Sequence, residues 1–106
     1  NLVALLGEEA VLREGPSGGG STDASDVAHL IPTQHIYMGG SVGGAHSKEF
    51  MIADKELAYI NAAKALICTA IDMLADGAEL GLDIKNNFKA PMTKEEYLTK
   101  WGHLNS

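Results

Sequence analysis

Residues 54–76, which read DKELAYINAAKALICTAIDMLAD, are the stretch that decides the fold. The stretch contains no Pro or Gly, and Ala is frequent in it. Its larger apolar residues recur with helical spacing, at Leu57, Ile60, Ile67, Ile71 and Leu74. We predict one long helix over this range, closed by Gly77 at its C-terminal end. Because Ala and Leu side chains make its other sides apolar too, we expect other elements to cover more than one face.

The sequence before this helix predicts short elements separated by glycine-rich loops. Residues 1–14 favour a short helix, which the loop at 15–20 ends. Residues 23–30 favour one or two helical turns, with Ser21 or Thr22 as the cap, ended by Pro32. Residues 33–38, Thr-Gln-His-Ile-Tyr-Met, alternate and favour β-structure, and are therefore the best strand candidate.

The chain after this helix predicts a helical tail, residues 77–106. Residues 79–88 and 93–101 favour two short helices divided by Pro91. Thr93 and Glu96 have the Thr-x-x-Glu spacing of a capping box, which predicts a helix start just before Tyr97. The expected fold class is therefore α/β, with one long helix, one or two short strands and the tail, in a single segment spanning 1–106.

Charge and composition exclude several classes of protein. The 106 residues include 14 acidic and 8 basic side chains, for a net charge of −6, and no basic patch. We therefore expect no binding to nucleic acid or to an anionic membrane. The one cysteine, Cys68, lies in the apolar helical stretch, which favours a packing role and a cytoplasmic location. The first residues lack an initiator Met, which we interpret as the cut end of a longer protein.

Two glycine-rich segments could carry chemistry. Residues 18–26, Gly-Gly-Gly-Ser-Thr-Asp-Ala-Ser-Asp, let the backbone approach a ligand and would direct helical N–H groups at an anion such as a carboxylate. The alternative is a turn that only caps a helix. Asp23 and Asp26 are best interpreted as first-turn acids that the helix dipole favours, rather than as an acid/base pair.

The second segment, residues 39–46, ends in His46, at a position typical of exposed metal ligands and general bases. The alternative for any single histidine is a surface or packing role. The other histidines are His29, His35 and His103, and the set has no zinc-finger spacing. We therefore expect no complete metal site from this chain alone.

The order of these motifs resembles the end of the catalytic domain of metal-dependent amidohydrolases of the aminoacylase and carboxypeptidase G superfamily. The resemblance covers about residues 15–80 and rests on Gly20-Ser-Thr-Asp-Ala-Ser-Asp-Val27, Ile31-Pro32-Thr33 and Gly44-Ala-His46. Within the superfamily, these segments are most similar to the p-aminobenzoyl-glutamate hydrolase B-subunit type. The resemblance implies a C-terminal piece of a zinc-exopeptidase-like, three-layer αβα domain.

The resemblance also implies roles for individual residues. His46 would be a metal ligand that completes a site for two divalent ions, Mn²⁺ or Zn²⁺. Ser21, Thr22 and Asp23 would shape the substrate pocket beside the metals. Gly43 and Gly44 would keep the approach to His46 open.

The whole enzyme would cleave the amide bond of an N-acyl or aminobenzoyl amino acid, or of a dipeptide. The other metal ligands and the general-base Glu of the family have no counterpart here, so the piece alone should be inactive. Its expected partners are the amide substrate, the remainder of the catalytic domain, and further subunits in a homo- or hetero-oligomer. The alternative function is a non-catalytic binding or assembly module that uses the glycine loops and the apolar helix. A stand-alone metal carrier would require several histidines to converge.

Overall fold

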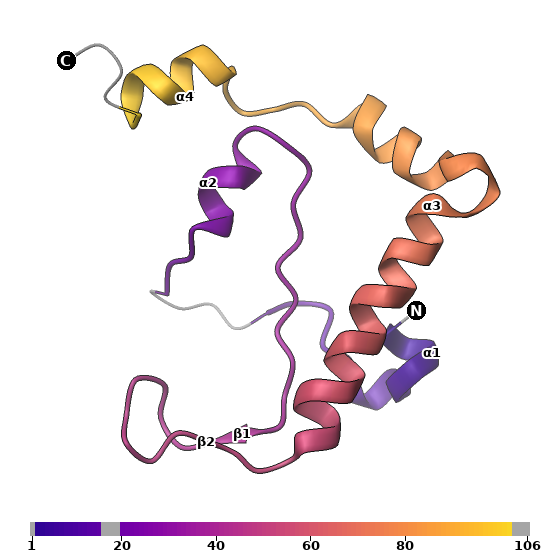
Figure 1. The fold of residues 1–106 in the computed structure, drawn as a ribbon, viewed down its shortest axis with the longest axis vertical. Helices are drawn as coiled ribbons and strands as arrows, with labels where there is room; N and C mark the ends of the chain where they lie inside the picture. The colour runs from indigo at the N-terminus through magenta and orange to yellow at the C-terminus, as the bar shows by residue number, and fades with distance from the viewer. Residues whose placement is uncertain (1, 16–19, 103–106) are drawn as a thin grey trace.

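The computed structural model describes residues 2–15 and 20–102 of the chain. The described elements are, in order, α1 (Leu2–Leu6), η1 (Glu8–Ala10), α2 (Ala24–Ala28), β1 (Ser41–Val42), β2 (Met51–Ile52), η2 (Glu56–Asn61), α3 (Ala62–Asn87) and α4 (Lys94–Lys100). Figure 1 shows α3 along one side of a flat frame, with α4 and α2 at one end and the hairpin β1–β2 at the other. The expected short N-terminal helix is present as α1 and η1.

The long helix begins where the sequence predicts. The Asp54 carboxylate accepts a hydrogen bond from the Leu57 N–H at 2.9 Å, and the Asp54 carbonyl accepts one from the Ala58 N–H at 3.0 Å. A side-chain oxygen that binds the N–H three residues on satisfies one of the free donors of the first turn. The first six residues, η2, are wound as a π-helix and continue directly into α3.

The predicted end of the long helix at Gly77 is also confirmed. Residues Ala75–Ala78 leave the helical conformation, and Asp76, Gly77 and Ala78 have φ values of 50°, 73° and 62°. Gly adopts such values at little cost, which suits it to this position. After the break, a second helical stretch runs in a new direction to Asn87, close to the predicted end at residue 88 (Figure 1).

The capping box of the tail is confirmed. The Glu96 N–H donates to Thr93 Oγ1 at 3.1 Å, and the Thr93 N–H donates to Glu96 Oε2 at 2.7 Å. These two bonds satisfy donors at the start of α4 that have no partner inside the helix. The hydrogen bonds from the Thr93 backbone and side chain lower the pKa of the Glu96 carboxyl group.

The prediction of a cap at Ser21 or Thr22 is met in part. Asp23 directly precedes α2 and makes no side-chain capping bond, but the Ala24 N–H donates to Thr22 Oγ1 at 3.4 Å. The Thr22 carbonyl also accepts from the Ser25 N–H at 3.0 Å and from Ser25 Oγ at 2.7 Å. The glycines Gly18 and Gly19 of this loop lie outside the described residues.

The strand predicted at residues 33–38 is not formed. The described strands are β1 and β2, which pair antiparallel with Ser41 opposite Ile52 and Val42 opposite Met51. Residues 32–40 instead form an extended connection from α2 to β1 (Figure 1). Exposure alternates along it as in a strand, with residues 36, 38 and 40 half-buried and residues 35, 37 and 39 exposed. Its backbone makes no hydrogen bond to a described residue from Gln34 to Gly39, so the pairing that defines a strand is missing.

The chain buries little of its apolar surface. Ala65 is the only described residue that is buried, while large side chains on α3 such as Leu66, Ile67 and Leu74 are 58–71% exposed. The chain exposes 8713 Å², against roughly 5,700 Å² for a folded protein of this size. Its radius of gyration is 17.3 Å, against about 13 Å for a compact domain.

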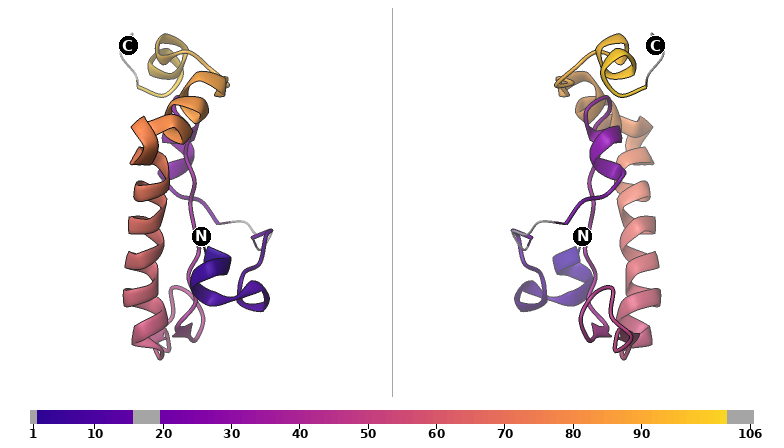
Figure 2. Two further views of the ribbon diagram at one scale, coloured as in Figure 1. Left: turned by 90° about the vertical axis from the view of Figure 1, so that its right-hand side faces the viewer. Right: turned by 90° about the vertical axis from the view of Figure 1, so that its left-hand side faces the viewer.

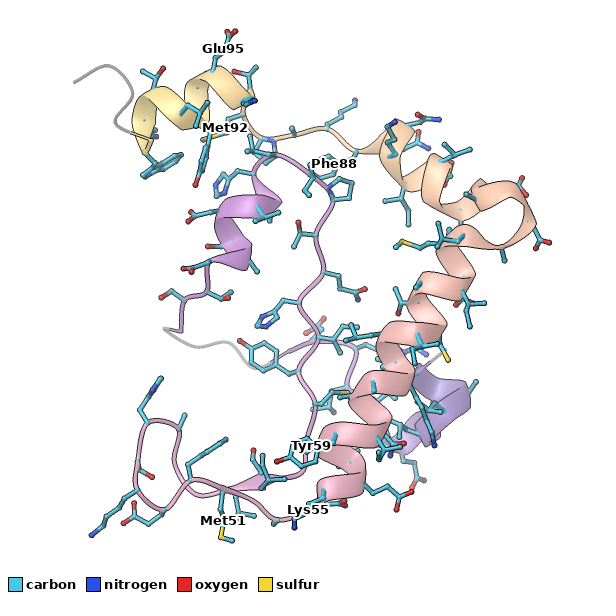
Figure 3. All side chains as sticks on the ribbon, viewed as in Figure 1. Met51, Lys55, Tyr59, Phe88, Met92 and Glu95 are labelled. Carbon is cyan, nitrogen blue, oxygen red and sulfur yellow. The ribbon has the colours of Figure 1, made fainter. Side chains whose placement is uncertain are left out.

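The thickness of the molecule explains this exposure. Its extents are 46 × 43 × 20 Å, and Figure 2 shows the frame edge-on, with α1 projecting from it. Met51 on the hairpin and Tyr59 at the start of the helix point away from the ribbon in Figure 3, and both are more than half exposed. The prediction that other elements cover several faces of the long helix is therefore not met within the described residues. The three-layer αβα arrangement stays a prediction.

The helical stretch Glu56–Asn87 is also long and apolar enough to cross a membrane, with a hydropathy of 1.4 over its best 18-residue window. One such helix is weak evidence, because core helices of soluble proteins have the same length and composition. This stretch contains Lys64 and Asp72, and each charge costs about 2.5–3.5 kcal/mol at the centre of a bilayer. The expectation of no membrane partner stays a prediction.

Candidate functional site

His46 lies in the loop that joins β1 to β2, in a hydrogen-bonded β-turn. The Ser47 N–H donates to the Gly44 carbonyl at 3.2 Å, and Ser47 Oγ donates to the same oxygen at 2.7 Å. The Phe50 N–H then donates to the Ser47 carbonyl at 3.2 Å. His46 is therefore the third residue of an ordered turn and not part of a loose loop.

The backbone of His46 has the conformation that usually selects glycine at this position. Its φ is 62°, and a turn with a positive φ at its third residue favours Gly or Asn. A side chain with a Cβ atom is strained in this region, at a cost of about 1–3 kcal/mol. The imidazole is exposed and makes no hydrogen bond, ion pair or ring contact with another described residue. Both ring nitrogens are thus free, within the described chain, to bind a ligand.

The two glycines predicted beside His46 differ in what the structure requires of them. Gly43 has a φ of 84°, and a Cβ atom there would collide with the carbonyl group of Glu49 on the returning arm of the loop. A Cβ atom on Gly44 would meet only the Ser47 side chain, with Oγ at an ordinary 3.6 Å and Cβ at 3.9 Å. Gly43 is therefore required by the close crossing of the two arms, whereas Gly44 has room for a side chain.

Sequence reasoning missed Gly40, which anchors the hairpin to the long helix. The Gly40 carbonyl accepts from the N–H groups of Ala53 and Asp54 at 2.8 and 2.9 Å. Its φ is 101°, and a Cβ atom there would lie 2.6 Å from the Asp54 carbonyl oxygen and 2.9 Å from Ala58. The Gly39-Gly40 pair in the sequence indicates such a close approach, because glycine often marks a site where another part of the backbone comes near.

Ser21, Thr22 and Asp23 lie at the start of α2, and all three are exposed. The turn here is held by backbone bonds, including the Asp26 N–H to the Asp23 carbonyl at 3.1 Å. Thr22 Oγ1 lies 3.4 Å from the Ala24 nitrogen, and the Asp23 carboxylate makes no hydrogen bond to a described residue. The loop thus presents a free carboxylate and hydroxyl groups to solvent.

The structure does not join this loop to His46. No hydrogen bond, ion pair or ring contact links them in the part of the chain that the structure describes, and Figure 1 shows α2 and the β1–β2 hairpin, the elements that carry them, on separate segments of the frame. Those residues also contain no cluster of three or more His, Cys, Asp or Glu side chains that could hold a metal. The rings of His29 and His35 contact Trp101 and Tyr37 respectively, and His103 lies outside the described residues. The described histidines therefore do not converge as a metal carrier would require.

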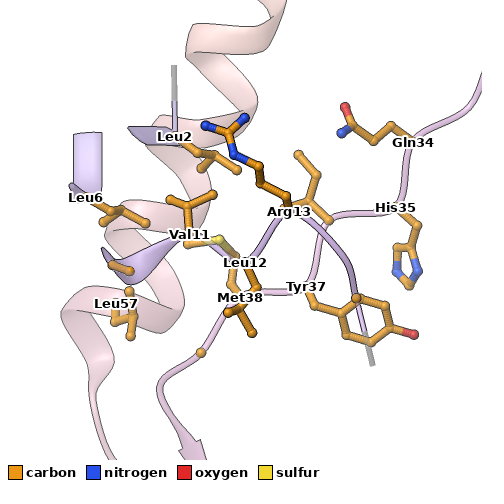
Figure 4. Close-up of a pocket in the computed structure, with 14 residues that line it drawn as sticks. Leu2, Leu6, Val11, Leu12, Arg13, Gln34, His35, Tyr37, Met38 and Leu57 are labelled. Atoms are coloured by element: carbon orange, nitrogen blue, oxygen red, sulfur yellow. The ribbon is translucent and has the colours of Figure 1, made fainter. Parts of the chain in front are cut away.

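A cavity of about 560 Å³ lies elsewhere, between the N-terminal segment and the extended connection (Figure 4). Its walls are mostly apolar and include Leu2, Leu6, Val11, Met38 and Leu57. The exposed Arg13 at its edge pairs with Glu8 at 2.8 Å. Sequence analysis did not predict this cavity, because it depends on residues 2–13 lying against residues 34–39.

Comparison with known proteins gives no relative that bears on this geometry. No family model matches the chain, and neither a curated protein nor a solved structure matches it.

Proposed function

We propose that this chain is the C-terminal part of the catalytic domain of a metal-dependent amidohydrolase, of the p-aminobenzoyl-glutamate hydrolase B-subunit type. The whole enzyme cleaves the amide bond of an N-acyl or aminobenzoyl amino acid, or of a dipeptide. The observation that carries the proposal is His46, an exposed histidine held at a φ of 62° in an ordered turn where glycine is the favoured residue. Strained residues of this kind are concentrated at active sites and ligand-binding sites.

The chemistry of His46 fits one position in a metal site. A neutral imidazole nitrogen is a good ligand for Zn²⁺ and also binds Mn²⁺. The turn fixes the direction in which the ring leaves the backbone, because Ser47 closes it with two bonds to the Gly44 carbonyl. His46 supplies one ligand, and a site for two divalent ions takes its remaining ligands and its general-base Glu from outside the described residues.

Two divalent ions bound at such a site lower the pKa of water and polarise an amide carbonyl. The residues of this chain act around that reaction. Ser21 and Thr22 offer hydroxyl groups and backbone to the substrate, and Asp23 offers a carboxylate that fixes a polar group of the substrate. Gly43 keeps the two arms of the hairpin in contact, and this contact sets the position of His46.

The remainder of the catalytic domain is the partner that the proposal requires. The unpaired backbone from Gln34 to Gly39 and the exposed apolar side chains of α3 are surfaces that a larger sheet and its helices would cover. Residues 33–39 then become a strand of that sheet, as their alternating exposure favours. We place the enzyme in the cytoplasm, in keeping with the single thiol of Cys68.

The test is metal content and hydrolysis in the full-length protein that contains this chain. We expect His46→Ala to lose about one metal equivalent by elemental analysis, and to release glutamate from p-aminobenzoyl-glutamate at least about 100-fold more slowly. The matched control is His35→Ala, which removes another exposed histidine and should leave metal content unchanged. Unchanged metal content in His46→Ala, or a wild type without metal, would contradict the proposal.

A second candidate function is a non-catalytic assembly module. It is favoured by the exposed apolar surface of α3, where Leu66, Ile67 and Leu74 lack contacts that would bury them. In this case α3 forms an interface with a protein partner, and His46 has no role. The His46→Ala experiment separates the two functions, because the assembly module predicts no change in metal content.

A further inference from the structure

The helical tail contacts α2 through aromatic rings. Trp101, at the end of α4, lies against His29, just after α2, with ring centroids 5.8 Å apart and planes tilted by 53°. Tyr97 contacts the same indole at 5.6 Å, and the Lys100 ammonium group lies 4.7 Å from its centroid. Tilted rings at these separations attract one another. Figures 1 and 2 show α4 and α2 side by side, although they come from opposite ends of the chain.

From His29, hydrogen bonds continue to the loop before α2. His29 Nδ1 lies 2.7 Å from the Ser25 carbonyl oxygen, which can only accept, so Nδ1 carries the hydrogen. Ser25 in turn donates from both its N–H and its Oγ to the Thr22 carbonyl, at 3.0 and 2.7 Å. Ring contacts and hydrogen bonds therefore connect Trp101 through His29 and Ser25 to Thr22.

The helix α2 needs such a contact to keep its shape. It has five residues, far fewer than the 12–15 at which isolated helices become even marginally stable. The Asp23 side chain does not cap its first turn, where the Ala24 N–H donates to Thr22 Oγ1 at 3.4 Å, and none of its residues is buried. The residues that are half-buried at its end are Ala28, His29 and Leu30, and of these His29 contacts Trp101 of the tail. The ring contact of Trp101 with His29 therefore joins the tail to the C-terminal end of this short helix.

We propose that Trp101 is a positioning residue: through His29 and Ser25, the tail helix α4 fixes the loop Ser21–Asp23 at the start of α2. The description of this loop as substrate-facing rests on the proposed function, whereas the contact between the helices does not. The tail residues 93–102 then have a role in the site, although they lie far from it in the sequence.

The first experiment measures amide hydrogen exchange in the 106-residue chain. We expect Trp101→Ala to speed exchange of the Ser25 and Asp26 amides by about three- to ten-fold, because a ring contact of this kind is lost. Trp101→Phe keeps a ring and should restore most of the protection. Thr99→Ala, an exposed change in the same helix, is the matched control and should leave exchange unaltered.

The second experiment uses the fluorescence of Trp101, the single tryptophan. The His29 ring lies against the indole, with centroids 5.8 Å apart, so removing the imidazole should change the intensity or wavelength of the indole emission. His103 is two residues from Trp101 in the sequence, so emission is compared in a His103→Gln background. There, His29→Gln should change the emission, whereas His35→Gln should leave it unchanged.

The outcomes separate this proposal from the proposed function. Unchanged exchange at residues 25 and 26 in Trp101→Ala, or unchanged indole emission in His29→Gln, would overturn the positioning role whatever the activity of the enzyme. Faster exchange in Trp101→Ala together with unchanged metal content in His46→Ala would support the contact between α4 and α2 and contradict the proposed hydrolase function. In the full-length enzyme, Trp101→Ala should raise KM for p-aminobenzoyl-glutamate more than it lowers kcat, and Trp101→Phe should restore KM.

Discussion

At the residue scale, the loop between β1 and β2 shows how a few backbone angles can place one side chain. Gly43 and His46 have φ values of 84° and 62°, and only the first of these residues is the type that such angles favour. The hydrogen bonds of Ser47 to Gly44 hold the strained residue in the turn. The position of His46 is therefore set by its neighbours, and its own conformational preference works against it.

The two glycines before His46 give a matched pair of substitutions. Gly43→Ala should weaken the hairpin by about 1–3 kcal/mol, because the new Cβ atom would meet the Glu49 carbonyl and φ would stay positive. Gly44→Ala should change its stability by less than about 0.5 kcal/mol, because the new atom meets only Ser47 at van der Waals distance. Amide exchange at Met51 and Phe50 measures both. Equal effects of the two substitutions would show that the two arms do not cross as described.

At the scale of elements, local signals account for the helices and fail for the strand. The Asp54 cap, the break at Gly77 and the Thr93–Glu96 capping box each use bonds within a few residues. Residues 33–38 have the composition of a strand and alternate in exposure, yet they remain unpaired. A helix satisfies its own backbone, whereas a strand needs a neighbour to do so.

The capping box predicts a dependence of α4 on pH. The Thr93 hydrogen bonds hold the pKa of Glu96 below its ordinary value, so the ionised form is favoured in the folded state. The stabilisation is therefore present above the ordinary pKa of the unfolded chain, 4.5, and is lost as the pH falls through the lower folded pKa. Amide exchange or chemical shifts of Tyr97 and Leu98 should report loss of helix in this acidic range.

Two variants test the origin of this pH dependence. Glu96→Gln keeps a hydrogen-bond acceptor without the titration, and the acidic loss of α4 should become smaller. Glu95→Gln removes a neighbouring charge outside the box and should leave the transition in place. An identical transition in all three proteins would exclude Glu96 as its cause.

At the scale of the whole molecule, the described chain forms defined helices and a hairpin but almost no buried core. Ala65 is the one buried residue among those described, and the frame is 20 Å thick. An exposed apolar surface favours association with other protein surfaces, because each Å² of apolar area removed from water contributes about 25 cal/mol of favourable free energy. The long helix and the extended connection thus expose apolar side chains and unpaired backbone, which under the proposed function the remainder of the catalytic domain would cover.

Scattering from the isolated chain tests this description. Its radius of gyration in dilute solution should lie near 17 Å, and not near the 13 Å or so of a compact domain of this length. The chain should also bind a hydrophobic fluorescent dye in its native state, since the side chains of Leu66 and Leu74 are largely exposed. A compact particle that binds no dye would mean that the helices close onto each other in solution.

The sequence by itself determined the features that local bonding controls. It placed the long helix from its Asp54 start to the break at Gly77, the two tail helices and the Thr93–Glu96 cap. It also identified His46 and the Ser21–Asp23 loop as candidate site residues, although the structure does not join them. The helix predictions are confirmed because helical spacing, caps and helix-breaking residues act over a few residues. The site assignments stay predictions.

Only the tertiary structure decided what depends on residues far apart in the chain. It showed the contact of Trp101 with His29, the cavity between residues 2–13 and 34–39, and the close approach of Gly40 to Ala58. It also left residues 33–38 without a partner strand, where the sequence predicted a strand. Long-range pairing and ring packing are set by which surfaces meet in space, and no local pattern of residues specifies that meeting.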